Sequence, residues 1–538
     1  MSAAPISITS QLPSLPAPAR RRVGWQLLVA WGALGLMLAV ELPVFLCMGL
    51  DCDTCFYDLI ARRVMAGQTH YRDTLDTNLP GPVWLHMLFR SIVGWSSEAL
   101  RAVDFAIAAC SVWLLTNMLP RSMPDWGRVA TGGALLTFYL STSEWCHCQR
   151  DPWMLLPCLV ALRLRGRQSD RLAEGDSSGL FRWAFVEGII WGAAFWIKPF
   201  VAVPALACWI VSAWPSLGMP GTRKRMGLDF IGLLSGGLMI GGTGVVWLVA
   251  TGAWADFVDI MFRWNAEYYQ FKFVDGPWWA APLGTALRLF PWVFVHLVAI
   301  PIAIVAVWRG TLVRGAVSRL FATFYLAWLF QSAVLQHSWD YVHVPSILLG
   351  IVVLVTRVCG PRGGGRTAAI AFLVGAASWS TVVVAVQIAP TWTQCVREGS
   401  TPATRARTGR LGRTNWTDLD RVGRYLREQG AREDEVCVLN TSLLAVYNDR
   451  SLWPSSRYLF LNDNLKVFRS HRDSILSSLA RSKQRFLVCD LNRGDQALVR
   501  QAIESGHAER LAFRAGDYAV FRVEGREMPE WLATHAIP

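Results

Sequence analysis

Long apolar runs constrain this chain most strongly, and three of them cover residues 23–50, 228–250 and 368–389. Each is about as long as the roughly 20 residues that a helix needs to cross the hydrocarbon core of a bilayer. Many of the 27 tryptophans lie near the predicted ends of such runs, where an indole ring favours the membrane interface. The chain is therefore predicted to be a mainly α-helical, polytopic membrane protein.

The net charge of +13 is spread along the chain, because arginines separate the apolar runs instead of forming one basic face. This pattern indicates membrane topology and argues against nucleic acid as a partner, since Arg and Lys accumulate in cytoplasmic loops. The basic loops that orient the helices are 20–22, 121–128, 163–182, 223–225, 309–319 and 357–366. If all of them are cytoplasmic, two helices must lie between each consecutive pair.

One apolar run, 83–95, does not fit this pairing. It is short and follows Pro80-Gly81-Pro82, so it is predicted to be a juxtamembrane element that does not cross. The remaining runs give about eleven crossings, with the N-terminus cytoplasmic and the C-terminus outside. Residues 1–22 are then a disordered cytoplasmic tail, and residues 23–390 form the membrane domain.

After Pro390 the composition becomes polar and charged. Residues 391–416 are predicted to be a linker, and residues 417–538 a small extracytoplasmic α/β domain with no nucleophile elbow, phosphate loop or dinucleotide fingerprint. The expected elements of this domain are helices at 418–429 and 495–504 and strands at 436–440, 458–461, 486–491, 511–514 and 518–523.

The segment 51–82 leaves the first apolar run and is rich in carboxylates. Ionisable groups at a lipid boundary are costly and usually functional, and one carboxylate there could act as a general base on an acceptor hydroxyl. The alternative is a helix cap, because Asp51 and Asp53 precede a helix-like run, 56–66. The predicted topology places this segment on the outer face with the loops 141–151, 251–282 and 336–341 and with the junction at Lys198.

Several spacings in the membrane domain resemble the start of GT-C glycosyltransferases. They are Asp53-x-x-x-Tyr57, Ala66-Gly67, Tyr71-x-Asp73, the turn from Pro80 to Trp84, and Ser96-x-x-x-x-Arg101. The closest resemblance is to the glycosyltransferase family 39-like branch, which contains the lipid A aminoarabinose transferases and the protein O-mannosyltransferases. The resemblance implies a GT-C fold and transfer of a sugar, with inversion, from a polyprenyl-phosphate donor to an extracytoplasmic glycan, lipid or protein acceptor.

The resemblance also assigns roles to residues. It implies that Asp53 is the catalytic carboxylate and Asp151 a second one, whereas the residues alone also allow Asp151-Pro152 to be a helix start. It makes Lys198 a ligand of the donor phosphate, although a lysine here could equally snorkel to the interface. The supporting residues are Tyr57, Tyr71, Glu144, Arg150 and Tyr341.

Two departures from the family pattern concern the donor phosphate. Asn78-Leu79-Pro80 stands where the resembled transferases have a lysine before proline, and His337 replaces a lysine before Tyr341. The resemblance therefore leaves a phosphate contact to be supplied by other cations. The candidates are Arg263, Lys272 and His337.

Four cysteines, Cys52, Cys55, Cys146 and Cys148, lie in two outer loops that are expected to converge. A disulfide, a zinc site and ordinary small apolar side chains all remain open for them. The sequence predicts no definite cofactor; a divalent metal is compatible with the acidic loop but not indicated.

The resemblance places the protein in the bacterial plasma membrane, with membrane lipid around it. The alternative function is a transporter or a non-catalytic scaffold of cell-envelope assembly. Transporters usually hold their ionisable groups near the bilayer midplane in broken helices, whereas the charges here gather at one interface. This distribution favours the enzyme.

Overall fold

The computed structural model describes residues 24–214, 222–273, 276–309, 316–358, 366–412, 414–448, 452–492 and 509–522. Within these ranges the protein is mostly helical, with one small sheet near the C-terminus. The predicted tail 1–22 and the predicted helix 495–504 lie outside the described residues.

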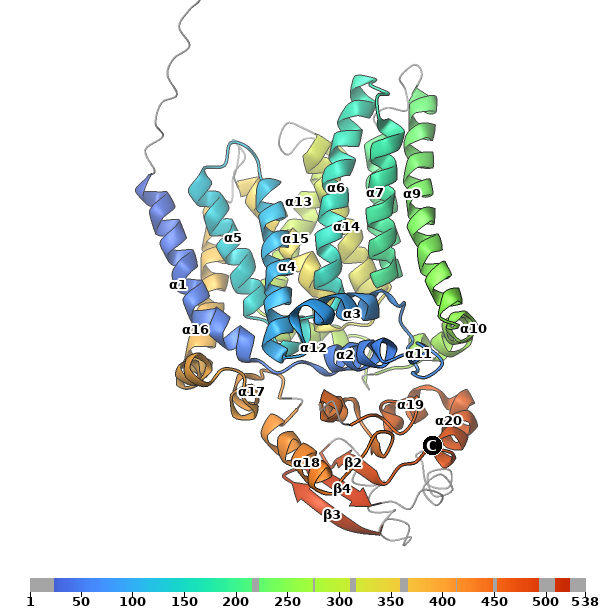
Figure 1. The fold of residues 1–538 in the computed structure, drawn as a ribbon. Coiled ribbons are helices and arrows are strands. Elements are labelled where there is room, and N and C mark those ends of the chain that lie inside the picture. The colour runs from blue at the N-terminus through green and yellow to red at the C-terminus, as the bar shows by residue number, and fades with distance from the viewer. Residues whose placement is uncertain are drawn as a thin grey trace, which may run out of the picture.

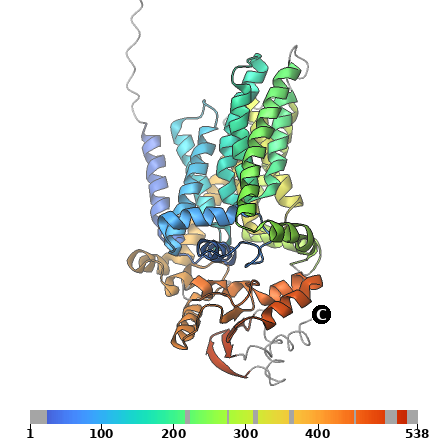
Figure 2. The same ribbon diagram turned by 45° about the vertical axis from the view of Figure 1, so that its right-hand side comes forward.

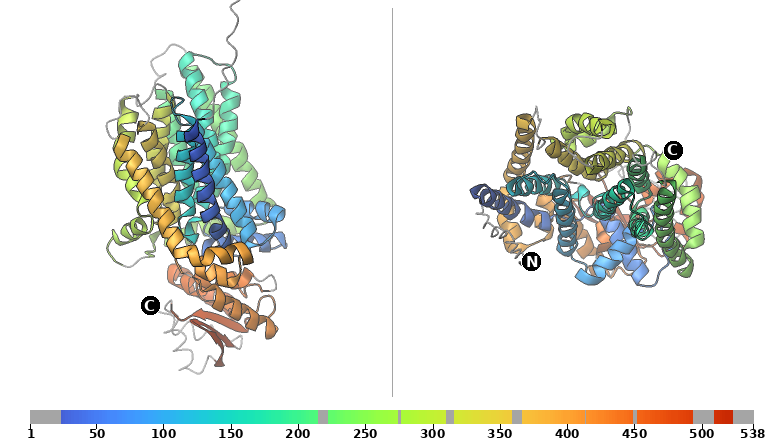
Figure 3. Two further views of the ribbon diagram at one scale, coloured as in Figure 1. Left: turned by 90° about the vertical axis from the view of Figure 1, so that its left-hand side faces the viewer. Right: turned by 90° about the horizontal axis from the view of Figure 1, so that it is seen from above.

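The long helices form a bundle in which their axes run roughly alongside one another, and Figure 3 shows the bundle from the side and end-on. The bundle helices are α1 (Trp25–Cys47), α4 (Ser97–Asn117), α5 (Asp125–Leu140), α6 (Arg150–Glu174), α7 (Leu180–Ile197), α8 (Ala202–Ala213), α9 (Thr222–Ala250), α13 (Val295–Arg309), α14 (Ala316–Val334), α15 (Asp340–Val358) and α16 (Arg366–Glu398).

Within the described ranges, four helices are long and apolar enough to span a membrane: α1, α4, α7 and residues 223–250 of α9. A fifth span results if α12 (Ala280–Arg288) is joined to residues 292–308, across a bend of 109°. These findings are consistent with a membrane protein. The predicted number of about eleven crossings is not confirmed by helix length and composition.

Short helices cover the end of the bundle that faces the C-terminal domain (Figure 1). They include α2 (Cys52–Met65), α3 (Gly81–Val93), α10 (Trp254–Asp259) and α11 (Asn265–Gln270), and a π-helical turn, Ile260–Trp264, joins the last two. At 13 residues α3 is too short to cross a bilayer, as expected for a non-crossing element. Residues 254–270, which belong to the predicted outer loop 251–282, are helical.

Buried ion pairs fasten these elements to one another. Asp58 of α2 accepts hydrogen bonds from His86 Nδ1 (2.7 Å) and Arg90 Nε (2.8 Å) of α3. Arg165 of α6 binds Glu187 of α7 (2.6 Å) and Asp229 of α9 (2.7 Å). A buried charge is tolerated only when it is paired, so these contacts fix how the helices are placed relative to one another.

The boundary between the membrane domain and the linker differs from the prediction. Helix α16 continues through Pro390 to Glu398, and α17 (Pro402–Thr408) follows. A similar proline, Pro43, lies inside α1, where the carbonyl of Ala39 accepts a hydrogen bond from the Trp392 indole of α16 (3.1 Å). Proline is tolerated inside such helices when a neighbour satisfies the freed carbonyl.

The C-terminal domain lies beneath the short helices, at the opposite end of the molecule from the start of α1 (Figures 1 and 2). Its sheet has the order β1-β2-β4-β3, with β1 and β2 parallel and the other pairs antiparallel. The elements are α18 (Trp416–Glu428), β1 (Val436–Val438), α19 (Leu461–Val467), α20 (Arg472–Ala480), β2 (Phe486–Asp490), β3 (Glu509–Ala515) and β4 (Tyr518–Arg522).

Most of the predicted elements of this domain are confirmed, but the prediction of a strand at 458–461 is wrong. Helix α19 begins at Leu461, and Tyr458 and Leu459 are buried without pairing in the sheet. The nearest ladder contact is an isolated bridge between Val436 and Pro454. A short apolar run indicates that its residues are buried, but burial alone does not distinguish a strand from an irregular segment.

Candidate functional site

A cavity of about 420 Å³ opens where the short helices meet the ends of α6, α7 and α15. Segments far apart in the sequence contribute its walls: the 77–79 loop, the start of α6, the Lys198 junction, the 261–269 helix and the 335–341 loop. Its polar lining includes Asn78, Arg150, Lys198, Tyr268, His337 and Tyr341. All four predicted outer segments and the Lys198 junction therefore contribute to one cavity.

Lys198 lies in extended backbone between the end of α7 and Pro199. Its Nζ is 2.6 Å from Oδ2 of the fully buried Asp151 and 5.4 Å from the centre of the Tyr341 ring. Burial lowers the pKa of Lys198 to about 8, although the Asp151 carboxylate opposes this shift. The structure thus places Asp151 as the partner that holds the Lys198 ammonium at the cavity wall.

Arg150 is the first residue of α6 and the second cation of the cavity. Its Nη1 donates to Oδ1 of Asn78 and its Nη2 to the Tyr341 hydroxyl (3.3 Å). Its guanidinium lies 5.5 Å from the centre of the Tyr57 ring. Arg150 was predicted only as a supporting residue, but it lines the cavity together with the asparagine that replaces the expected lysine.

Asp53 lies beside the cavity and does not line it. Its Oδ2 receives only long contacts, from Trp145 Nε1 (3.4 Å) and Gln149 Nε2 (3.5 Å). Trp145 in turn packs on the cavity residues Trp339 and Tyr341, with ring centres 5.3 and 5.8 Å apart. A half-buried carboxylate with weak contacts can still accept a proton, which suits a general base.

The other aspartates of the loop have local structural partners. Asp51 caps α2 by accepting from the backbone N–H of Asp53, and Asp58 binds His86 and Arg90. Asp73 accepts from the backbone N–H of Thr69 (2.7 Å), and Asp76 accepts from Asn78 and His70. The cap predicted as the alternative for the Asp51 and Asp53 pair is therefore present, and Asp51 provides it.

Three predicted residues do not reach the cavity. Arg263 is exposed and pairs with Asp259 (3.1 Å), Lys272 is exposed, and neither lines the cavity. Glu144 is buried and accepts hydrogen bonds from the backbone N–H groups of Arg410 and Leu411, so it anchors the linker. Of the three extra phosphate ligands considered, only His337 lies at the cavity.

Of two further predicted residues, Tyr71 lies near the cavity and His337 lines it. Tyr71 is buried and its hydroxyl donates to the carbonyl of Asn78 (2.7 Å). His337 lies among aromatic rings, with Tyr268 and Phe273 at 5.7 and 5.2 Å, and burial lowers the pKa of its imidazole. His337 is therefore a neutral hydrogen-bonding group more readily than a cation.

Several residues of the site were not predicted from the sequence. Tyr268, Tyr269 and Trp339 line the cavity, and Gln149 contacts Asp53. The 251–282 segment is rich in aromatic residues, but nothing in its sequence distinguishes the tyrosines that line the cavity from the others. Gln149 had a positional signal, because it directly precedes Arg150 and Asp151.

The outer-loop cysteines are free thiols, and within the described residues His147 does not belong to a group of side chains close enough together to hold a metal ion. His147 Nδ1 lies 3.2 Å from Arg101 Nη1, and its Nε2 lies 2.9 Å from the carbonyl of Tyr139. Ligand atoms of Asp51, Cys52 and Asp53 lie within 4.8 Å of one another, close enough for a metal ion. Since Asp51 already caps α2, this cluster by itself indicates no metal.

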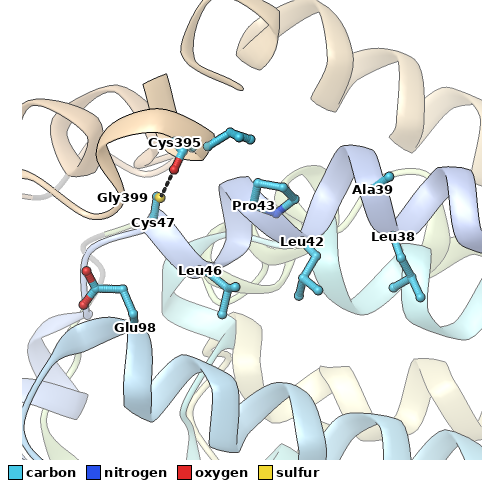
Figure 4. A pocket seen from close by; sticks show the side chains of 10 residues that line it. Leu38, Ala39, Leu42, Pro43, Leu46, Cys47, Glu98, Cys395 and Gly399 are labelled. Atoms are coloured by element: carbon cyan, nitrogen blue, oxygen red, sulfur yellow. Dashed lines mark hydrogen bonds between the residues drawn. The ribbon is translucent and has the colours of Figure 1, made fainter. Parts of the chain in front are cut away.

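A second cavity, of about 500 Å³, lies between the end of α1 and α16 (Figure 4). Its lining is almost entirely apolar, with Leu38, Leu42 and Leu46 along one wall. The Cys47 thiol donates to the carbonyl of Cys395 (3.6 Å) at its end, and Glu98 supplies the only charged side chain among its lining residues. It lacks the cations that distinguish the first cavity.

No protein-family model matches this chain, and no curated protein matches it either. A function is therefore inferred from the cavity itself, which has a buried lysine, a half-buried arginine, a hydroxyl and an amide at one wall and a half-buried carboxylate beside it. Such a wall can bind an anionic group and stabilise negative charge that develops on it.

Proposed function

We propose that this protein is a membrane glycosyltransferase of the GT-C type, which moves a sugar from a polyprenyl-phosphate donor to an extracytoplasmic acceptor with inversion. The observation that carries this proposal is that two cationic side chains, Arg150 and Lys198, line one cavity among elements at an end of the helical bundle. A phosphate attached to a lipid needs this location, because its headgroup lies at the membrane interface.

The donor phosphate is the leaving group, and Arg150 and Lys198 would stabilise the charge that forms on it. The Arg150 guanidinium offers a planar fork of donors and Lys198 a point charge. The Tyr341 hydroxyl and the Asn78 amide flank the same space. Donors that are already oriented cost no reorganisation when the bond to the anomeric carbon breaks.

Asp53 would act as the general base. As the acceptor hydroxyl oxygen attacks the anomeric carbon from the face opposite the phosphate, its proton passes to the Asp53 carboxylate, and the bond between the sugar and the phosphate oxygen breaks. In this proposal Asp151 supports the site and is not a second catalytic carboxylate. Because it binds Lys198 at 2.6 Å, it would orient the cation, and the proton would pass to Asp53 instead.

The substitution Asp53→Asn tests the proposal. It should reduce sugar transfer from a polyprenyl-phosphate sugar by at least about 100-fold, the usual range for loss of a general base. Asp73→Asn is the matched control, because it makes the same change in the same loop at a carboxylate that binds the Thr69 backbone and the neighbouring Arg72 and does not line the cavity. Transfer that survives Asp53→Asn would refute the role of Asp53. A wild-type protein that binds the lipid phosphate without transferring sugar would favour the transporter or scaffold alternative.

We also propose that the chain crosses the membrane about eleven times, with the N-terminus inside and the C-terminal domain outside. In support, the start of α1 and the C-terminal domain lie at opposite ends of the bundle, as an odd number of crossings requires (Figure 1). A reporter that is active only outside the cytoplasm, fused to the C-terminus, checks this arrangement; activity restricted to a cytoplasmic reporter would reverse it.

A further inference from the structure

We infer that Arg457 of the C-terminal domain is a positioning residue for the cavity, acting through Tyr71 and Asn78 on Arg150. This inference rests on the proposed function, because it gives the C-terminal domain a role in donor binding. Arg457 belongs to the irregular segment before α19 and is separated from Tyr71 by 386 positions in the sequence.

Arg457 holds the 71–75 segment at two points. Its Nη2 donates to the carbonyl of Tyr71 (3.0 Å), and its own carbonyl accepts from the backbone N–H of Leu75 (3.0 Å). The guanidinium also lies 6.0 Å from the centre of the Trp264 ring, in the helix that forms another wall of the cavity. One residue of the C-terminal domain thus contacts two of the segments that surround the cavity.

Tyr71 needs such support, because its φ of 67° places it in left-handed backbone that tyrosine rarely adopts. A residue in this region persists when its surroundings hold it there. Its ring stacks on His70, with centres 3.9 Å apart, and is fully buried. In this conformation the Tyr71 hydroxyl reaches the carbonyl of Asn78 (2.7 Å).

Asn78 is then fixed from both sides. Its carbonyl accepts from Tyr71, and Asp76 Oδ1 accepts from both the backbone N–H (2.9 Å) and the side-chain Nδ2 (2.8 Å) of Asn78. With Nδ2 directed at Asp76, the amide oxygen Oδ1 faces Arg150 and accepts from its Nη1. A series of hydrogen bonds therefore runs from Arg457 to a cation of the cavity.

A second contact of the C-terminal domain supports the same role. Glu267, one helical position before the cavity residue Tyr268, accepts from the backbone N–H of Ser470 (3.1 Å) and lies 3.0 Å from His471 Nδ1. His471 also stacks on Trp264 at 3.8 Å. The domain thus holds the 254–270 segment as well as the 71–78 loop.

The test uses the full-length protein in detergent, with two measurements on Arg457→Ala. Amide hydrogen exchange over residues 69–80 should become about tenfold faster, as expected for loss of one buried hydrogen bond. The KM for the polyprenyl-phosphate sugar should rise about tenfold while kcat changes little, because the loss affects binding of the phosphate. Arg457→Lys keeps one donor and should recover part of both effects.

Arg485→Ala is the matched control, since Arg485 is an arginine of the same domain that pairs with Glu435 (3.1 Å), within that domain. It should leave both measurements at the wild-type level. Tyr71→Phe removes the link to Asn78 and should raise KM to a similar extent. Combined with Arg457→Ala it should add little, because both changes interrupt one series of contacts.

The outcomes separate this inference from the proposed function. Unchanged exchange in Arg457→Ala, or an equal change in Arg485→Ala, overturns the inference even if sugar transfer is observed. If the wild-type protein transfers no sugar, the proposed function fails, and binding of polyprenyl phosphate itself replaces KM. In that case faster exchange with unchanged binding of the lipid phosphate again overturns the inference.

Discussion

Lys198 is the residue of the site whose charge depends most on its surroundings. Burial lowers its pKa to about 8, and Asp151 keeps it from falling further. The ammonium is therefore present in the unliganded protein below this pH and is lost as the pH rises through it. A phosphate ligand bound to the charged form would favour retention of the proton.

We expect kcat/KM for the polyprenyl-phosphate donor to be highest below pH 8 and to fall about tenfold per pH unit above it. The fall reflects loss of the Lys198 charge in the free enzyme. Lys198→Arg should remove this inflection, because a guanidinium stays protonated across the range. A pH profile of kcat/KM for both proteins checks this, and the same inflection in Lys198→Arg would assign it to another group.

At the level of residues, the sequence supplied the candidates and the structure separated them. The acidic loop contains several aspartates that look equivalent in the sequence. Their partners distinguish them: Asp51 caps a helix, Asp58 lies in a buried ion pair, and Asp53 receives only long contacts. The cap at Asp51 is local and could be predicted, but the partners of Asp58 come from α3 and those of Asp53 are Trp145 and Gln149, so no local pattern could reveal them.

At the scale of elements, the backbones of helices α7 and α9 lie unusually close together where glycines face the neighbouring helix. An ideal Cβ on Gly236 would lie 2.0 Å from the carbonyl oxygen of Phe185, and one on Gly188 would lie 2.0 Å from that of Leu233. The two helices therefore approach more closely than any side chain allows. Small residues permit such contacts between membrane helices.

Gly236→Ala should destabilise the protein by about 1–3 kcal/mol, because the added methyl group must separate α7 from α9. Gly241→Ala is the control on the same helix, since an added Cβ there meets no atom within 4 Å. Thermal unfolding in one detergent compares the two variants. Equal melting temperatures would show that the close contact contributes nothing to stability.

Element positions were largely predictable, and the errors have physical causes. Apolar runs located the helices of the bundle, since each must present apolar side chains to lipid or to its neighbours. The apolar run 368–389 ends before Pro390, where the membrane domain is predicted to end, but helix α16 continues to Glu398. The segment 458–461, expected to be a strand, is irregular and leads into α19. Its side chains are buried, but its backbone does not pair with a strand of the sheet.

At the scale of the whole molecule, helix α11, which lines the cavity, lies at the same end of the bundle as the C-terminal domain (Figures 1 and 2). The domain contacts the walls of the cavity through Arg457 and His471. Neither contact could be inferred from the sequence, because each joins residues about 200 or more positions apart, and the composition of the domain indicated only a soluble α/β unit.

The central claim is that the cavity beside Asp53 binds the phosphate of a polyprenyl-phosphate donor. A cryo-electron microscopy structure of the full-length protein with polyprenyl phosphate bound tests it most directly. The phosphate should lie in the cavity, within hydrogen-bonding distance of both Arg150 and Lys198. A phosphate bound elsewhere, for example at the apolar cavity between α1 and α16, would contradict the account.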